Sequence, residues 1–255
     1  MCSKWSLFFT VAILCSGCYS KQTNTDTITI ATAANMQFAM EALSEQFTAE
    51  TGIVCQLVVS SSGKLTAQII EGAPFDLFVA ANMKYPEAVY ERGLAQEPPR
   101  IYAYGKLVLW TMRPDLSPDI PILNTPTIKQ IAVANPKTAP YGQAASETLQ
   151  SLQLDSSLQA KLVFGESIAQ TNSFILTQVA DLGFTAMSVV LSPRMKNQGH
   201  WIAIDEQYYQ PITQGLVLLK GNNDNAERSR QFYNFLFSTE AKEILQDFGY
   251  TPANR

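Results

Sequence analysis

The feature that most constrains the fold is a regular alternation of β-branched runs and amphipathic segments that begins at residue 27. Residues 27–33 (TITIATA) and 54–60 (VCQLVVS) are rich in β-branched residues and predict strands. Residues 36–50, between them, carry apolar residues at helical spacing and stop before Gly52, which suits a helix end. This strand–helix–strand order predicts a parallel sheet with right-handed crossovers.

The alternation continues almost to the end of the chain. Further strands are expected at residues 76–80, 107–111, 131–134, 162–164, 184–187, 201–204 and 215–220, and helices at 64–71, 86–92, 141–152, 168–181, 225–237 and 239–248. Two α/β lobes joined by strands would account for this length, and one domain is the alternative. In open α/β sheets ligands bind at the carboxyl ends of strands, so the default site is a cleft between two such lobes.

The N-terminus predicts export. Lys4 precedes the apolar residues 5–14 (WSLFFTVAIL), which are too few to span a bilayer but match the core of a signal peptide. Three of the four cysteines lie in the first 18 residues, and only Cys55 lies in the body. The body therefore cannot form an internal disulfide.

A lipid anchor is expected where this leader ends. The sequence CSGC resembles the lipobox of bacterial lipoproteins, although Cys15 stands where that motif usually has Leu. The resemblance implies a signal peptide at residues 1–17, lipid attachment to Cys18 and a polar tether at 18–26. The protein would be held at the membrane on the periplasmic or outer side, and an ordinary cleaved signal is the alternative.

Charge and composition exclude several functions. The net charge is -4, from 18 basic and 22 acidic residues, and no long Lys/Arg run is present. Nucleic-acid binding through a basic surface is therefore not expected. The sequence has one histidine, His200, which argues against a histidine-rich metal site.

Four junctions between strands and helices could hold a small anion. They comprise residues 33–35 (AAN), 61–63 (SSG), 139–142 (APYG) and 166–168 (ESI). A helix start offers unpaired N–H groups and a partial positive charge, and Asn and Ser add side-chain donors. Each junction alone is more often a structural cap. Two from each lobe, facing across a cleft, would form a cage of neutral donors without Arg or metal.

Several segments together resemble a known family. They are IATAANM (30–36), SSSGKL (60–65), EGAPFDLF (71–78), NP (135–136), PYG (140–142) and LGF (182–184), followed by the aromatic segments near residues 232–236 and 248–250. In this order, over roughly residues 27–254, they resemble periplasmic molybdate-binding proteins, the substrate-binding subunits of molybdate ABC importers. The SSSGKL and GAPFDLF blocks are the most specific part.

The resemblance implies a fold. It is the two-lobed type II periplasmic-binding-protein fold, in which each lobe is a mainly parallel sheet flanked by helices. Residues 27–105 and 206–255 would form lobe 1, and residues 106–205 would form lobe 2. The ligand would lie in the cleft between the lobes.

The resemblance also implies the ligand set. Asn35 and Ser62 would bind the anion from lobe 1, and Tyr141 and Ile168 would bind it from lobe 2 through their backbone N–H groups. Many relatives have Ser at the position of Asn35 and a ligating Tyr at the position of Ala186. The missing donor would come from the Asn35 amide or the neighbouring Ala34 backbone.

The function expected from these observations is capture of molybdate and tungstate and their delivery to an ABC permease. The protein would act as a monomer, without enzymatic activity or cofactor, and molybdenum would be present only as the oxyanion cargo. A binding protein for sulfate or phosphate is the nearer alternative. The remote alternative is an exported serine enzyme, because Ser61 and Lys64 match S-x-x-K, although no SDN or KTG motif accompanies them.

Overall fold

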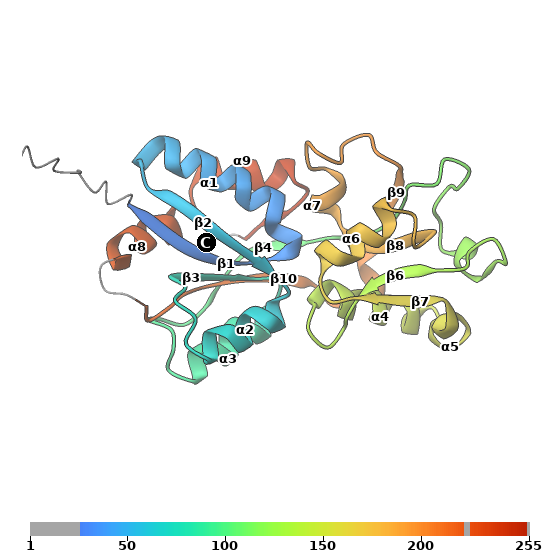
Figure 1. Cartoon of the computed structure of the whole chain (residues 1–255), viewed down its shortest axis with the longest axis horizontal. Coiled ribbons are helices and arrows are strands. Elements are labelled where there is room, and N and C mark those ends of the chain that lie inside the picture. The colour runs from blue at the N-terminus through green and yellow to red at the C-terminus, as the bar shows by residue number, and fades with distance from the viewer. Residues whose placement is uncertain (1–25, 222–224, 254–255) are drawn as a thin grey trace, which may run out of the picture.

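The structure is a computed structural model that describes residues 26–221 and 225–253. Cys18, the signal peptide and most of the tether lie outside these residues. Within the described part of the chain, no helix is both long enough and apolar enough to span a membrane. Two sheets, each flanked by helices, lie side by side along the longest axis (Figure 1). The predicted fold class, two α/β lobes each built on a sheet flanked by helices, is confirmed.

The first sheet has the strand order β11-β4-β10-β3-β1-β2 among the described residues. Its strands are β1 (Thr27–Ala33), β2 (Val54–Ser60), β3 (Leu77–Ala80), β4 (Arg100–Gly105), β10 (Ile212–Leu218) and β11 (Thr251–Pro252). Side chains alternate between its two faces, as the strand period of two requires. On β3, Leu77 and Val79 enter one hydrophobic cluster and Phe78 and Ala80 enter another.

Helices cover both faces of this sheet (Figure 1). On one face lie α1 (Gln37–Thr51), α8 (Ala226–Phe235) and α9 (Thr239–Asp247). Here Phe47 and Phe232 meet edge to face, with ring centroids 5.0 Å apart. On the other face lie α2 (Ser62–Ile70) and α3 (Lys84–Glu91). Both faces of the first sheet are therefore covered, which leaves the ends of its strands as the place for a site.

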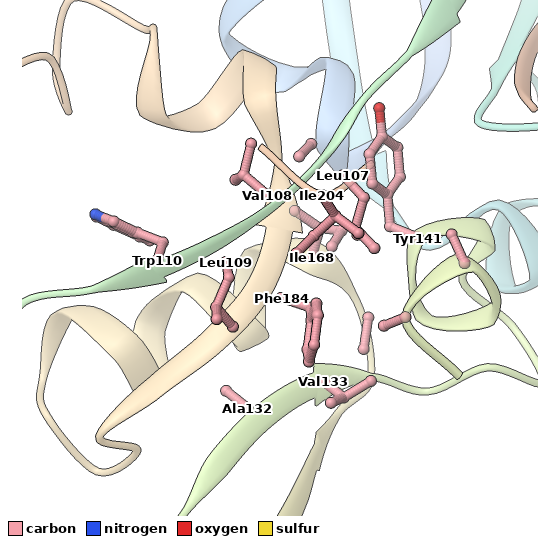
Figure 2. Packing of buried hydrophobic residues seen from close by; sticks show 14 of the residues in the cluster. Leu107, Val108, Leu109, Trp110, Ala132, Val133, Tyr141, Ile168, Phe184 and Ile204 are labelled. Carbon is pink, nitrogen blue, oxygen red and sulfur yellow. The ribbon is translucent and has the colours of Figure 1, made fainter. Parts of the chain in front are cut away.

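The second sheet has the order β7-β6-β8-β5-β9 among the described residues. Its strands are β5 (Leu107–Thr111), β6 (Ile131–Ala134), β7 (Leu162–Gly165), β8 (Leu182–Ala186) and β9 (His200–Ala203). The accompanying helices are α4 (Pro140–Ser151), α5 (Asp155–Leu158), α6 (Ile168–Leu176) and α7 (Met187–Val190), with the 3₁₀ turns η2 (Pro121–Asn124) and η3 (Gln159–Lys161). Figure 2 shows Leu109, Val133 and Phe184 converging in the cluster that these elements enclose.

The chain passes between the sheets at two places. It leaves the first sheet at the end of β4 and enters the second at β5, with Lys106 between them. It returns between β9 and β10, through the 3₁₀ turn η4 (Glu206–Tyr208).

The expectation of mainly parallel sheets was wrong, because both sheets are mixed. Parallel pairing joins β1 to β2 and β3, and β6 to β7 and β8, whereas β10 pairs antiparallel with β3 and β4, and β5 pairs antiparallel with β8 and β9. Parallel neighbours need a crossover, usually a helix, within one sheet. Strands β5 and β10 follow the two crossings between the sheets, so they need no such crossover and can pair antiparallel with their neighbours.

Candidate functional site

A small pocket lies where the two sheets meet. All five residues expected to bind the ligand line it, namely Ala34, Asn35, Ser62, Tyr141 and Ile168. The same wall contains Ala33, Ser61, Ala81, Ala139 and Pro140. The structure therefore brings together the junctions at residues 33–35, 61–63 and 139–142 and the end of the fourth, at Ile168.

The start of α2 places two Ser62 donors at the pocket. The Gly63 N–H bonds to the Thr138 carbonyl at 3.0 Å, so it serves a contact between the sheets rather than the pocket. The Ser62 N–H has no partner within the helix. The Ser62 Oγ accepts the Ala81 N–H at 3.0 Å, which leaves its own hydrogen free to donate.

Asn35 does not cap a helix, although its position after a strand suggested that it would. It is the middle residue of the 3₁₀ turn η1 (Ala34–Met36), whose cap residue is Ala33. Ala34 and Asn35 thus present first-turn N–H groups, which lack intrahelical partners. A cap would have used its side-chain oxygen on these groups, whereas here the Asn35 side chain points elsewhere.

The Asn35 amide is held by Gln214 and Tyr250. The Gln214 Nε2 donates to the carbonyls of Ala81 and Ile212, at 3.3 and 3.1 Å, and this orients its Oε1 toward Asn35. The Asn35 Nδ2 donates to that Oε1 at 2.8 Å and to the Tyr250 hydroxyl at 2.9 Å. Both amide hydrogens are therefore engaged, and the Asn35 donor that faces the pocket is its backbone N–H.

Tyr250 and Ser188 complete a buried network beside the pocket. The Ser188 hydroxyl donates to the Asn35 carbonyl at 2.7 Å, and the two hydroxyls of Ser188 and Tyr250 lie 3.0 Å apart. Burial raises the pKa of Tyr250 to about 12, although its hydrogen bonds with Ser188 and Asn35 oppose that shift. The phenol therefore stays protonated and can donate at neutral pH. The sequence analysis found neither residue, since no local pattern links them to Asn35.

The start of α4 singles out the Tyr141 N–H. Pro140 has no N–H, and the N–H groups of Gly142 and Gln143 bond to the Ala139 carbonyl at 2.9 and 3.1 Å. The Tyr141 N–H is therefore the first-turn donor left over. The Tyr141 side chain is fully buried and packs toward Gly105, at the strand that connects the two sheets. Burial also raises the pKa of its phenol well above the ordinary value.

The start of α6 contributes in the same way. Ser167 caps this helix by accepting the Gln170 N–H at 3.4 Å, and Ile168 follows as the first helical residue. The Ile168 side chain packs in the second-sheet cluster, which Figure 2 shows together with Leu107 and Phe184 of the same cluster. Only its backbone is left for a ligand.

The electrostatics of the pocket favour an acceptor-only ligand. None of the lining residues carries a carboxylate, an ammonium, a guanidinium or an imidazole. Three helix starts and one 3₁₀ start direct partial positive charge toward the pocket. Nearby, Lys64 of α2 pairs with Glu166 on the other side of the cleft, and both are exposed. A second contact between the lobes is the hydrogen bond that the Tyr85 hydroxyl donates to the Lys137 carbonyl at 3.2 Å.

The arrangement of Ser61 and Lys64 does not favour the serine-enzyme interpretation. Ser61 is the cap of α2, and its Oγ accepts the backbone N–H of Lys64 at 3.4 Å. The Lys64 ammonium pairs with Glu166 instead of approaching that hydroxyl. Ser61 nevertheless lines the pocket, although the predicted ligand set contained Ser62 and not Ser61. The run of three serines before Gly63 was the signal that could have suggested it.

Comparison with known proteins gives concordant matches. Residues 28–251 match the family model described as bacterial extracellular solute-binding protein. The molybdate-binding protein ModA of Azotobacter vinelandii is 36% identical over 225 residues, which cover 88% of this chain and 89% of that protein. A putative ABC transporter substrate-binding lipoprotein of Bacillus subtilis, YvgL, is 29% identical over 98% of this chain and 99% of its own length.

A solved structure also matches this chain over most of its length. The periplasmic molybdate-binding protein of Azotobacter vinelandii superposes with a TM-score of 0.85 at 33% identity, covering 89% of this chain and 100% of that one. A sulfate-binding protein of Mycobacterium tuberculosis, SubI, superposes with a TM-score of 0.72 at 12% identity, a likeness that concerns the fold alone.

Proposed function

The chain belongs to the bacterial extracellular solute-binding proteins, and among them to the molybdate-binding proteins ModA; on this premise we propose that it captures molybdate, and tungstate with it, for delivery to the permease of an ABC importer. The observation that carries the proposal is the donor-only pocket. Backbone N–H groups of Ala34, Asn35, Ser62, Tyr141 and Ile168 and the Ser62 hydroxyl surround it, without an ionised lining side chain.

The chemistry of the oxyanions supports this choice. Molybdate and tungstate are fully deprotonated dianions near neutral pH, so their oxygens only accept hydrogen bonds. A protonated phosphate oxygen would also need an acceptor, and leaving its O–H unpaired costs about 1–3 kcal/mol. Sulfate is a pure acceptor, but its oxygens lie closer to the central atom and cannot reach every donor in a cage built for molybdate.

Closure of two lobes around the anion is part of the proposal. We assign residues 27–105 and 206–255 to lobe 1 and residues 106–205 to lobe 2, with the hinge where the strands cross between the sheets. The contacts of Gly63 with Thr138 and of Tyr85 with Lys137 link the lobes at the pocket and would form on closing.

The lipid anchor is a separate proposal. Lipid attachment at Cys18 would tether a monomer to the membrane beside its permease, and the lipobox-like CSGC sequence supports this. The relative YvgL, whose name describes a lipoprotein, supports it too. Mass spectrometry of the exported protein should find a lipidated N-terminal Cys18, and a Cys18→Ser variant should be released from membranes. An unmodified N-terminus elsewhere would disprove the anchor.

Calorimetric titration of the ligand-stripped protein tests the binding function. Molybdate, tungstate, sulfate and phosphate would each be titrated, with thermal unfolding in parallel, because a ligand at about 100 times Kd adds about 2.7 kcal/mol of stability. We expect tight binding of molybdate and tungstate and silence with the other two. Silence with all four anions would refute the ligand assignment. A preference for sulfate would establish the nearer alternative.

A further inference from the structure

We propose that Ser188 and Tyr250 are positioning residues for the oxyanion: they hold Asn35 in the pocket wall and tie it to the second lobe. The inference rests on the proposed molybdate binding. Neither residue lines the pocket, and both act through Asn35, which does. All three side chains are buried.

The first step is the fixed direction of the Asn35 amide. Carbonyl oxygens cannot donate, so the Gln214 amide that bonds to two of them must present its oxygen to Asn35. Only the Asn35 Nδ2 can satisfy that oxygen, at 2.8 Å. Its second hydrogen goes to the Tyr250 hydroxyl at 2.9 Å. The carboxamide is therefore a structural anchor, and an anion contacts Asn35 through its backbone.

The second step is a closed circuit of hydrogen bonds. Tyr250 accepts from the Asn35 amide and can donate to the Ser188 Oγ at 3.0 Å. Ser188 in turn donates to the Asn35 carbonyl at 2.7 Å. Each hydroxyl thus donates one hydrogen and accepts another, and the circuit begins and ends on Asn35. Such a circuit holds the Asn35 side chain and the peptide between Asn35 and Met36, and it thereby fixes the turn whose preceding peptides carry the Ala34 and Asn35 N–H groups.

The third step is that the circuit spans both lobes. Asn35, Gln214 and Tyr250 belong to segments around the first sheet, whereas Ser188 lies on α7, which follows β8 of the second sheet. Gly249, beside Tyr250, packs closely against Met187 and Leu191 at the two ends of the same helix. Bringing α7 against η1 therefore completes the circuit and sets the donors of the first lobe at once.

This arrangement has a consequence for anion size. Rigid spacing of donors is what separates molybdate from the smaller sulfate, so loosening η1 should reduce the discrimination as well as the affinity. Ser188 stands two positions after Ala186, whose methyl side chain cannot donate to an anion. The second lobe supplies its hydroxyl here to the Asn35 carbonyl instead of to the pocket.

The test compares Ser188→Ala, Tyr250→Phe and the double variant by calorimetry, with molybdate as ligand and sulfate as competitor. Each single variant leaves the Asn35 carbonyl one donor, since Tyr250 can reach it directly at 3.1 Å. We expect molybdate affinity to fall about threefold to tenfold in each single variant, and in the double variant by more than the product of the two. The molybdate-to-sulfate ratio should fall with it.

Two matched controls are available. The Tyr102 hydroxyl is buried without a hydrogen-bond partner among the described residues, so Tyr102→Phe removes a phenol oxygen but no bond. The Ser192 hydroxyl bonds within its own turn to the Val189 carbonyl at 2.7 Å, so Ser192→Ala matches Ser188→Ala. Both controls should keep molybdate affinity and the ratio within about twofold of the wild type.

The possible outcomes separate this inference from the proposed function. If the wild type does not bind molybdate, the proposed function fails and the inference fails with it. If the wild type binds but Ser188→Ala and Tyr250→Phe keep its affinity and ratio, only the inference is overturned. A lower melting temperature of the ligand-free variants with unchanged affinity and ratio would also overturn it, because the residues would then be structural only.

Discussion

The two lobes contribute different kinds of group to the proposed anion site. The first lobe brings the Ser62 hydroxyl together with backbone donors, and the Asn35 side chain is fixed by a buried network. The second lobe brings the N–H groups of Tyr141 and Ile168, whose side chains are packed in the interior. We therefore expect residue identity to matter for binding mainly in the first lobe. In the second lobe what matters is where the helices begin.

The largest expected effect is on stability, and it comes from truncating Ile168, whose side chain should matter for folding but not for binding. Ile168→Ala removes side-chain atoms from the second-lobe cluster, where the residue is 4% exposed, and keeps the backbone N–H. The free energy of unfolding should fall by about 2–5 kcal/mol. Molybdate affinity of the folded protein should stay within a few-fold of the wild type. Denaturant unfolding and calorimetry at low temperature would measure the two quantities.

Ile175→Ala is the matched control on the same helix. Ile175 is also buried in the cluster but does not line the pocket. It should lose comparable stability and keep its affinity. The comparison between the lobes would break if Ile168→Ala abolished binding at temperatures where Ile175→Ala still binds, since the Ile168 side chain would then be part of the site.

Removal of the Ser62 hydroxyl should have the reverse effect of Ile168→Ala, with a large loss of molybdate affinity and a small loss of stability. Hydrogen bonds to a charged group are worth about 1.5–3 kcal/mol each, so Ser62→Ala should weaken molybdate binding at least tenfold. The Ala81 N–H also loses its acceptor, which adds a modest loss of stability. Ser229→Ala, which removes a buried hydroxyl without a partner among the described residues, is the control. Unchanged affinity in a Ser62→Ala titration would remove this hydroxyl from the site.

A methyl group added at Gly63 should impair closure of the lobes without affecting the folding of the ligand-free protein. A Cβ there would lie 3.0 Å from the Thr138 Cα and 3.1 Å from its carbonyl oxygen, across the cleft. Gly63→Ala should therefore hinder closing and weaken molybdate binding about tenfold, while the melting temperature of the ligand-free protein stays nearly unchanged.

Gly142→Ala is the contrast within one lobe. Its Cβ would lie 2.0 Å from the Ala134 carbonyl oxygen, so the second lobe itself must distort. This variant should unfold at a lower temperature without ligand. If Gly63→Ala also lowered the melting temperature of the ligand-free protein by a similar amount, closure would not be what residue 63 controls.

Sequence patterns predicted the parts of the fold that depend on local periodicity. The strand at 27–33 and the helix after it were predicted nearly to the residue. Strand β4 was not predicted, because residues 100–105 carry few β-branched residues and become a strand through pairing with β10 and β11. Residues 187–190 form the helix α7, although the pattern indicated a strand up to residue 187.

The site divides in the same way. The helix starts that contain Ser62 and Tyr141 are visible in the sequence, and the family resemblance then pointed to these two residues. The structure places both at the pocket. Tyr250 and Ser188 were not found, since they meet Asn35 from 215 and 153 residues away. Contacts at such separations depend on the relative placement of two sheets, which no local pattern encodes.

The pair of Lys64 and Glu166 offers the smallest test of the comparison. It joins the lobes near the pocket, and its side chains are 47% and 67% exposed, so the pair alone should matter little. Lys64→Gln removes both the pair and a positive charge near the anion, so molybdate affinity should fall about threefold at low salt. Glu166→Gln removes the pair but also a repulsive negative charge, and these effects should nearly cancel.

Glu97→Gln, which breaks the pair with Arg230 inside the first lobe, should leave affinity unchanged. Equal losses for Lys64→Gln and Glu166→Gln would mean that bridging the lobes matters more than the field at the anion, and losses that persist in high salt would exclude a screened surface effect.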